Sequence, residues 1–300
     1  MTHPAGGEIT SLRSPRVKAA RQLAKRAFRQ RARSFLAEGP QSVGAALESG
    51  AEITELFVTA PAASRHGGLV AAAARRGAPV HQVSGEVMAE LAQTVTPQGL
   101  LAVCRFIDIP LNQLTSQLTS RLAAARPGLV VILANVRDPG NAGTVLRTAD
   151  AAGADGVVFA GASVDPYNGK CVRAAAGSLF HLPVVAGAPL GAAISALRGA
   201  GLAILAADGS GPARLDDPAL AARLAGPAAW LFGNEAWGLP ADLLALADEA
   251  VAVPIYGQAE SLNLAAAAAV CLYASAREQR VAGGAGLARG GPRRCFPDER

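Results

Sequence analysis

One stretch of the 300-residue chain, Val130–Gly161, places both kinds of regular secondary structure within a short segment. It opens with five apolar residues, Val130–Ala134, whose length and β-branched content are typical of a strand buried on both faces. A polar loop follows, and apolar residues then recur at helical spacing from Ala142 until Gly153, where a glycine would end the helix. The stretch therefore predicts strand, loop, helix and strand in succession.

Two polar residues stand at the beginning of the predicted helix. Asn141 lies where the helix N-terminus would meet the carboxyl end of the strand, and Arg147 follows six residues later. Ligands bind at such junctions in open parallel sheets because free backbone N–H groups and the helix dipole converge there. This stretch alone leaves the simpler alternatives open, namely a helix cap for Asn141 and a solvated helix residue for Arg147.

The alternation of strand and helix continues through residues 129–281. Strict alternation predicts an α/β domain whose parallel sheet is covered by helices on both faces. We expect strands at Val130–Ala134, Gly156–Ala160, Leu182–Val185, Leu202–Ala206, Ala229–Phe232 and Ala250–Val253.

Residues 13–107 predict a smaller α/β domain with its own core. The remaining segments are interpreted as a loose leader over residues 1–12, a polar linker bounded by prolines over 108–128, and a disordered tail rich in Gly and Arg over 282–300. In the smaller domain we expect strands at Ser34–Glu38, Ile53–Thr59, Pro79–Val83 and Leu100–Phe106.

Composition limits the protein class. A hydrophobic content of 51% is ample for a folded core. The longest apolar run, Leu264–Ala274, is shorter than the roughly 20 residues that a membrane span needs, and no apolar run follows the initial Met, so we expect a cytoplasmic protein without a membrane partner. The four cysteines lack the spacing of zinc ligands, so no metal and no disulfide framework is expected.

Basic residues are concentrated near the N-terminus. Residues 1–107 carry 13 Lys and Arg against 7 Asp and Glu, whereas residues 108–281 carry 11 against 14. The segment Arg13–Arg33 holds nine basic residues and no acidic one, spread around every face of a predicted helix. A solvated helix usually mixes both signs, so this bias favours a nucleic-acid partner over an ordinary solvated face. The candidate RNA-binding residues are Arg16, Lys18, Arg21, Lys25, Arg26 and Arg29.

Three loops of the second domain concentrate polar residues. The first is the segment that contains Asn141 and Arg147. The second is Leu231–Pro240, in which glycines on both sides of a polar pair could let the backbone approach a flat ligand, although an ordinary tight turn is the alternative. The third, Tyr256–Asn263, leads into a helix so apolar that it must lie in a core or an interface. Here Ser261 as a helix cap, with Asn263 in the first turn, is the alternative to a functional role.

Together the three loops resemble the three motifs of the SpoU-type (TrmH family) RNA ribose 2′-O-methyltransferases, a branch of the SPOUT superfamily. The first domain is similar to the ribosomal-protein-like substrate-binding domain that often precedes this one, through FLAEGP at Phe35–Pro40 and TPQGLLAV at Thr96–Val103. The departures are small, with Val253 where isoleucine is usual and Pro240 where a serine often begins the helix. The matching motif residues are Asn141 with Arg147, then Gly233, Asn234, Glu235 and Gly238, then Glu260, Ser261, Leu262 and Asn263.

The resemblance implies an N-terminal α/β sandwich and a C-terminal parallel-sheet domain with a trefoil knot. It also implies a homodimer that binds S-adenosylmethionine and methylates a ribose 2′-hydroxyl in RNA. Ribosomal RNA is favoured as substrate; tRNA and a catalytically degenerate RNA-binding relative are the alternatives. By position, the implied cofactor-binding residues are Gly233, Val253 and Leu262, and the implied catalytic residues are Arg147, Asn141, Glu235, Ser261 and Asn263.

Other enzyme classes lack their motifs. No G-x-G-x-x-G follows the first strand of the second domain, and neither G-x-x-x-x-G-K-[ST] nor G-x-S-x-G occurs. All motif residues of the resemblance are present, which disfavours the degenerate relative. In this family the counterpart of Arg147 is proposed to be the general base, but a guanidinium is almost always protonated. We therefore expect Arg147 to grip a phosphate next to the target ribose.

Overall fold

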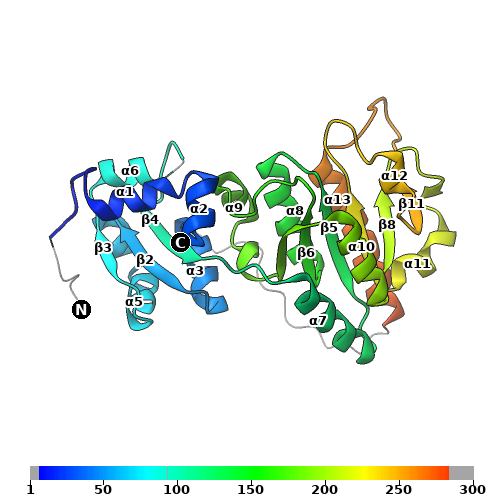
Figure 1. The fold of residues 1–300 in the computed structure, drawn as a ribbon, viewed down its shortest axis with the longest axis horizontal. Helices are drawn as coiled ribbons and strands as arrows, with labels where there is room; N and C mark the ends of the chain where they lie inside the picture. Colours follow the sequence, from blue (N-terminus) through cyan, green and yellow to red (C-terminus); the bar gives the residue numbers. More distant parts are fainter. Residues whose placement is uncertain (1–6, 93, 284–300) are drawn as a thin grey trace.

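The computed structural model describes residues 7–92 and 94–283, which form two α/β domains next to each other (Figure 1). The sheet of the first domain has the order β1-β4-β2-β3. The β1–β4 and β2–β4 pairs are antiparallel, and the β2–β3 pair is parallel. Its strands are β1 (Ser34–Glu38), β2 (Ile53–Val58), β3 (Val80–Gln82) and β4 (Leu100–Arg105).

The basic N-terminal segment differs from the single helix that the sequence predicts. It forms two helices, because the chain turns at residues 23–25 between α1 and α2. The predicted loose leader is also wrong for its described part, since Ile9 forms a parallel bridge with Val83 and packs, with Leu12, on the core beneath it. The helices of this domain are α1 (Pro15–Gln22), α2 (Arg26–Ala32), α3 (Gly39–Ser49), α4 (Ala60–Arg65), α5 (Gly67–Arg75) and α6 (Gly85–Leu91).

The second domain contains the predicted parallel sheet, in the order β7-β6-β5-β10-β8-β11-β9. Each neighbouring pair of strands in this order is parallel. The short edge strand β9 was not predicted. The strands are β5 (Leu129–Ala134), β6 (Gly156–Ala160), β7 (Val184–Ala188), β8 (Ala203–Ala207), β9 (Ala213–Arg214), β10 (Ala228–Phe232) and β11 (Glu249–Ala252).

Helices cover both faces of this sheet, as the alternation predicts. Along β5, Val131 and Leu133 belong to one core with residues of α8 and α13, while Val130 and Ile132 belong to another with residues of α7 and α10. One face carries α8 (Pro139–Ala152), α9 (Gly169–Ala175), η1 (Ser178–Phe180), η2 (Pro218–Leu220), α11 (Ala221–Ala225) and α13 (Leu264–Ala282), and the other carries α7 (Leu111–Ala123), α10 (Leu190–Gly199) and α12 (Ala241–Leu244).

The predicted linker over residues 108–128 contains a helix, which corrects the sequence interpretation. Leu114 and Leu118 of α7 are buried, and a methyl group added at Gly156 in β6 would lie 2.8 Å from Leu114 Cδ1. The leucines recur at helical spacing, but the Ser and Thr residues between them give the segment the composition of a linker. The helix therefore belongs to the second domain.

Two further predictions concern the ends of the chain and the membrane. The predicted tail, residues 282–300, lies outside the described residues except for its first two, and α13 ends at Ala282. Among the helices of residues 7–92 and 94–283, none has the length and apolar character needed to cross a membrane.

Candidate active site

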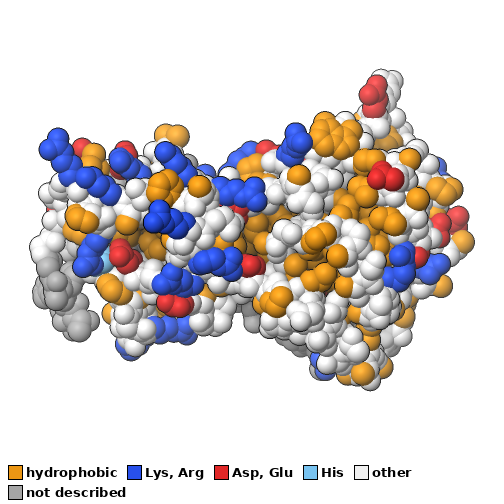
Figure 2. Space-filling model, in the orientation of Figure 1, with side chains coloured by type: hydrophobic (Ala, Val, Ile, Leu, Met, Phe, Trp, Pro, Cys, Tyr) orange, Lys and Arg blue, Asp and Glu red, His pale blue; other side chains and the backbone are white. Residues whose placement is uncertain are grey.

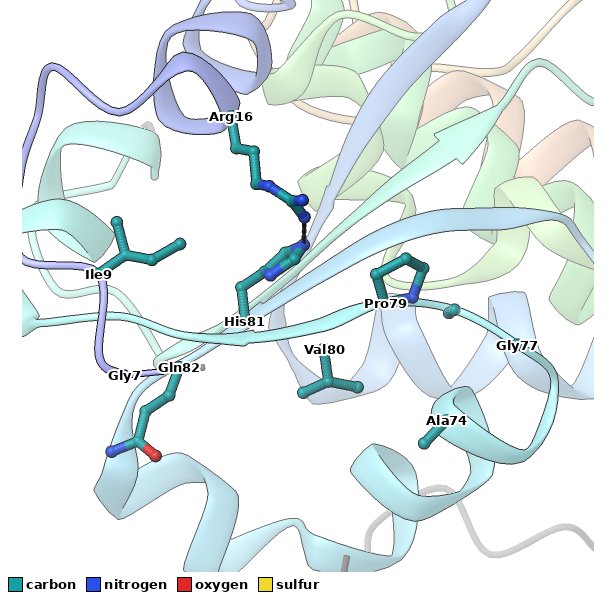
Figure 3. A pocket seen from close by; sticks show the side chains of 10 residues that line it. Gly7, Ile9, Arg16, Ala74, Gly77, Pro79, Val80, His81 and Gln82 are labelled. Carbon is teal, nitrogen blue, oxygen red and sulfur yellow. Dashed lines mark hydrogen bonds between the residues drawn. The ribbon is translucent and has the colours of Figure 1, made fainter. Parts of the chain in front are cut away.

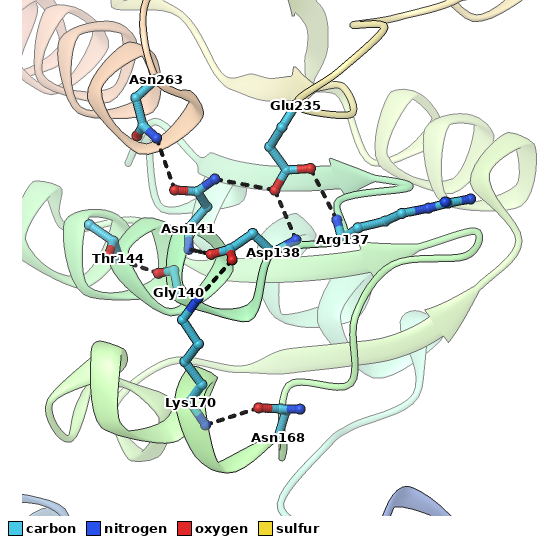
Figure 4. A network of polar contacts seen from close by, with 9 residues as sticks. All are labelled: Arg137, Asp138, Gly140, Asn141, Thr144, Asn168, Lys170, Glu235 and Asn263. Carbon is cyan, nitrogen blue, oxygen red and sulfur yellow. Dashed lines mark hydrogen bonds and ion pairs between the residues drawn. The ribbon is translucent and has the colours of Figure 1, made fainter. Parts of the chain in front are cut away.

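The first two polar loops begin side by side at one edge of the sheet. Strands β5 and β10 are parallel neighbours with Ala228 opposite Leu129 and Phe232 opposite Leu133, so both strands end at the same edge. The loop after β5 enters α8, and the loop after β10 enters α12. The N-terminus of α13 reaches the same place (Figure 4).

The helix caps at this edge differ from the simple alternatives that the sequence left open. Asp138, not Asn141, caps α8 and accepts a hydrogen bond from the Asn141 N–H at 2.8 Å. Asn263, not Ser261, caps α13 and accepts from the N–H groups of its first turn. An acidic residue followed by proline is a helix-start signal, so the sequence could have identified Asp138.

Three residues from the three loops form one hydrogen-bonded chain. The Glu235 carboxylate accepts the backbone N–H groups of Arg137 and Asp138 at 3.1 and 3.0 Å, and the Asn141 side-chain amide at 3.3 Å (Figure 4). The Asn263 amide in turn donates to Asn141 Oδ1 at 3.0 Å. The structure thus brings together Asn141, Glu235 and Asn263, which the sequence places far apart.

The hydrogen-bond donors and the ammonium group around Glu235 and Asp138 keep both carboxylates ionised. Partial burial would raise the pKa of Glu235, but the N–H groups of Arg137, Glu235 itself and Asp138, with the Asn141 amide, hold that pKa below its usual value. The Lys170 ammonium, 2.8 Å from Asp138 Oδ2, and the Asn141 N–H lower the pKa of Asp138. Glu235 is therefore a hydrogen-bond acceptor rather than a proton donor at neutral pH.

The glycines of the second loop close the loop on itself. Gly238 adopts a positive φ of 65°, and a methyl group added at Gly233 would lie 2.4 Å from the Gly238 carbonyl carbon. Asn234, between them, is buried and donates from its side chain to the Asn135 carbonyl at 2.8 Å. The absence of a side chain at Gly233 therefore allows close packing of the loop backbone, as in the tight turn that the sequence left open as the alternative to a ligand contact.

Arg147 and Ser261 do not join the hydrogen-bonded chain. Both are exposed, and within residues 7–92 and 94–283 neither side chain forms a hydrogen bond or ion pair. Arg147 lies on α8, the helix that carries Asn141 in its first turn. Its planar guanidinium has no acidic protein partner there, so its five donors can bind an anion from outside.

The edge formed by β10, β8 and β11 could hold a cofactor. Gly233 follows β10 and Val253 follows β11, on either side of the end of β8. In the described part of the chain, no backbone N–H of residues 253–262 donates a hydrogen bond to another protein group, and Ile255 and Leu262 are 38% and 39% exposed. Free polar backbone beside exposed apolar side chains fits a ligand with a flat apolar ring and polar edges.

Two neighbouring residues were not identified from the sequence. The Arg137 guanidinium lies 5.0 Å from the centre of the Trp237 ring, and Trp237 is 52% exposed. An exposed aromatic beside a functional site could have been suspected from the second loop alone. No group of three or more His, Cys, Asp or Glu residues that could hold a metal ion occurs in the part of the chain that the structure describes.

Basic side chains gather on the first domain, whereas fewer lie on the same face of the second domain (Figure 2). Of the nine basic residues in Arg13–Arg33, eight are exposed, including the candidates Arg16, Lys18, Arg21, Lys25 and Arg26. Arg29 corrects the prediction. It is 2% exposed and paired with Asp165, so it cannot contact RNA.

A cavity of about 540 Å³ lies against β3 in the first domain (Figure 3). Arg16 borders it and lies 2.8 Å from His81 Nε2, which accepts this hydrogen bond only when His81 is neutral. Burial and the Arg16 charge both lower the pKa of His81, in agreement with that state. None of the predicted catalytic residues lines this cavity.

Comparison with known families covers both domains. Residues 128–273 match the SpoU rRNA Methylase family. Residues 14–102 match the MRM3-like substrate binding domain. The two matches follow each other in the order in which the structure places the two domains.

Similar proteins span nearly the whole chain. The 23S rRNA (guanosine(2553)-2′-O)-methyltransferase RlmP of Bacillus subtilis is 34% identical over 266 residues, which cover 89% of this chain and 98% of that protein. The 23S rRNA (uridine(2479)-2′-O)-methyltransferase of Streptomyces viridochromogenes is 31% identical, with 93% and 95% covered.

A solved structure agrees with these sequences. The AdoMet-bound rRNA methyltransferase of Sinorhizobium meliloti superposes with a TM-score of 0.75 at 33% identity, covering 90% of this chain and 97% of that one. A match over 90% of this chain extends through both domains. This chain therefore belongs to the SpoU methylase family.

Proposed function

We propose that this protein transfers the methyl group of S-adenosylmethionine to a ribose 2′-hydroxyl of ribosomal RNA. The observation that carries the proposal is the set of hydrogen bonds that joins Asn141, Glu235 and Asn263, with the exposed Arg147 on the same helix as Asn141. Relatives that match over both domains are named 23S rRNA 2′-O-methyltransferases, and one similar structure has AdoMet bound.

S-adenosylmethionine, when bound, supplies a sulfonium methyl group, which is the electrophile of the reaction. Held against the backbone of Gly233, Val253 and Leu262, it would give this methyl group to the ribose oxygen and leave as S-adenosylhomocysteine, while the hydroxyl proton would pass to an acceptor. We assign to Arg147 the task of holding the phosphate next to the target ribose with two parallel hydrogen bonds. Such orientation accounts for several kcal/mol of barrier reduction, roughly 7 or more in favourable cases.

The hydrogen-bonded chain fixes the first turn of α8 on which this geometry depends. Glu235 holds the loop before α8 by two backbone N–H groups and holds the Asn141 amide in one orientation. Asn141 Oδ1 is then directed at Asn263. In this arrangement Asn141 and Asn263 present fixed polar groups to the nucleotide, with Ser261 adjacent to Asn263.

The backbone of Gly233, Val253 and Leu262 is the proposed cofactor contact. Its fit rests on the unengaged backbone of residues 253–262 and on the position of these residues at the ends of neighbouring strands. The trefoil knot that the family resemblance implies stays a prediction.

We also propose a homodimer that forms through α13. Its exposed side includes Val270, Tyr273 and Val281, which are 44%, 52% and 71% exposed and recur on one face of the helix. Exposed apolar residues aligned in this way are typical of an interface. Val281 also lies at the end of the described chain, so the test below uses Tyr273.

Ribosomal RNA is favoured because both long relatives are named for 23S rRNA, although a tRNA (guanosine(18)-2′-O)-methyltransferase of Escherichia coli also matches over 56% of this chain. The experiment is to map 2′-O-methylated nucleotides in total RNA from cells with and without this protein. Loss of one ribosomal methyl group is the expected result. Loss of a tRNA methyl group instead would overturn the choice of substrate.

A further inference from the structure

Arg29 connects the basic helices to the second domain. Its Nε and Nη2 donate to Asp165 Oδ2 at 3.0 and 2.7 Å, and the two side chains are only 3% and 4% exposed. Its Nη1 donates to the carbonyls of Leu23 and Ala24 at 2.9 and 2.8 Å. One guanidinium therefore holds the turn between α1 and α2 and fastens it to the loop before α9.

Other contacts between the domains fall on the same short segment around α9. The Tyr167 hydroxyl accepts the backbone N–H groups of Ile107 and Asp108 at 2.8 and 2.6 Å and donates to the Asp108 carboxylate at 2.8 Å. Arg173 of α9 lies 3.4 Å from Glu38 at the end of β1. The first domain thus rests on this segment through ion pairs, buried hydrogen bonds and the packing of Phe35 against Tyr167 and Phe180.

The opposite side of α9 packs directly on the helix that carries Asn141. A methyl group added at Gly143 of α8 would lie 2.3 Å from the Cys171 carbonyl oxygen and 2.7 Å from Ala174 Cβ. Lys170 of α9 pairs with Asp138, the cap of α8, at 2.8 Å. The first domain, α9 and α8 are therefore in continuous contact.

We propose that Arg29 and Asp165 are positioning residues that set the distance between the basic surface of α1 and α2 and the methyl-transfer site. The proposal rests on the proposed function and deepens it. The substrate it implies is a folded RNA large enough to contact both places, and the fixed distance decides which of its nucleotides reaches Asn141. A short hairpin that contains only the target nucleotide would use the second domain alone.

The physical basis is the gain from two binding surfaces held at a matching separation. When both surfaces engage one RNA, the second surface binds at a high effective concentration, which raises affinity by a factor of about 10² or more without any additional interaction. If the first domain were mobile, the effective concentration of the second surface would be lower and part of this gain in RNA affinity would be lost. A buried ion pair has a strict geometry and stabilises little overall, so an orientational role suits it better than a stabilising one.

The kinetic test compares wild type with the double variant Arg29→Gln/Asp165→Asn, which removes both charges and leaves no unpaired one. Methyl transfer is measured on a 23S rRNA transcript and on a short hairpin cut from it around the nucleotide that wild type methylates. We expect KM for the transcript to rise about tenfold or more. We expect kcat and the hairpin reaction to change less than twofold. The variant should also methylate additional transcript nucleotides.

A second measurement needs no substrate, so it separates this proposal from the proposed function. Two spin labels, on Ser64→Cys in the first domain and Thr119→Cys on α7, report the distance between the domains by pulsed double electron–electron resonance. The substitution Cys295→Ser removes a further cysteine that could take a label, and Cys104, Cys171 and Cys271 are buried. Dilution with unlabelled protein removes distances between two copies. We expect one narrow distribution in wild type and a broad one in the double variant of Arg29 and Asp165.

A matched control neutralises an ion pair that lies within the second domain. Arg121 Nε is 2.9 Å from Asp155 Oδ1, and Arg121→Gln/Asp155→Asn should change neither the transcript KM nor the distance distribution. An unchanged narrow distribution in the Arg29/Asp165 variant would overturn the proposal even if no methyl transfer is found. A broad distribution with an unchanged transcript KM would also overturn it. Absence of methyl transfer in wild type would instead reject the proposed function.

Discussion

Replacing Glu235 by glutamine perturbs the centre of the site while keeping the length of the side chain. Both carboxylate oxygens are used in the structure, Oε2 by the Arg137 N–H and Oε1 by the Asp138 N–H and the Asn141 amide. A glutamine has only one acceptor oxygen. Whichever way its amide turns, the NH₂ group faces at least one N–H donor, so the loop before α8 loses one or two hydrogen bonds.

The size of the effect follows from these hydrogen bonds. Hydrogen bonds to a charged group are worth about 1.5–3 kcal/mol each, and the exposed position of Glu235 places the expected decrease in unfolding free energy at about 2 kcal/mol. For a domain of this size that lowers Tm by about 5 °C. A displacement of Asn141 by about 1 Å should reduce kcat about 100-fold. Affinity for S-adenosylmethionine should change little, because its proposed contacts are the backbone groups of Gly233, Val253 and Leu262, and the Glu235 carboxylate bonds to Arg137, Asp138 and Asn141 instead.

The assay combines thermal unfolding with single-turnover methyl transfer for Glu235→Gln and a control, Glu48→Gln. Glu48 is an exposed glutamate of α3 whose carboxylate makes no hydrogen bond within the described residues. Because the pKa of Glu235 is lowered by folding, its stabilisation is fully present above the ordinary pKa of 4.5 and is lost as pH falls through the lowered pKa. The free energy of unfolding of Glu235→Gln should therefore fall less than that of wild type as the pH is lowered through this range. If Glu235→Gln unfolds and turns over like wild type, the assigned role of Glu235 is wrong.

Three other perturbations address the remaining parts of the proposal. Arg147→Ala and Arg147→Lys should both lower methyl transfer by orders of magnitude with S-adenosylmethionine affinity intact, measured by calorimetry; an active lysine variant would show that charge alone suffices. Tyr273→Glu should give monomers in light scattering at micromolar concentration, and a wild type that is already monomeric would reject the dimer. Neutralising the exposed basic residues Arg16, Lys18, Lys25 and Arg26 should weaken RNA binding without changing turnover at saturating RNA. The slope of log K against log salt concentration should become shallower by about 0.9 for each phosphate that the protein no longer neutralises. An unchanged slope would contradict the assignment of this surface to RNA binding.

Local patterns predicted the framework of the second domain well. The strand Gly156–Ala160 has the predicted bounds because it is buried on both faces and reads as a continuous apolar run. Gly153 ends α8 with a φ of 81°, as its position after the last apolar residue indicates. Helix α7 was missed because its apolar stripe is narrow and its composition is that of a linker.

Tertiary contacts explain what the sequence could not show. Arg29 resembles its basic neighbours in the sequence, and its partner Asp165 lies 136 residues away, so its burial is invisible to any local pattern. The meeting of Asn141, Glu235 and Asn263 also depends on strand order, in which β10 inserts next to β5. Sequence motifs named these three residues, but only the fold supplies their hydrogen bonds.

The central claim is that this chain methylates a ribose 2′-hydroxyl in ribosomal RNA. The most direct test incubates the purified protein with methyl-tritiated S-adenosylmethionine and ribosomal RNA from cells that lack it, and then locates the label after alkaline digestion. We expect label in a single nucleotide whose phosphodiester bond resists alkali, because its 2′-oxygen is blocked. Label on a base, or no incorporation with correctly folded protein, would contradict it.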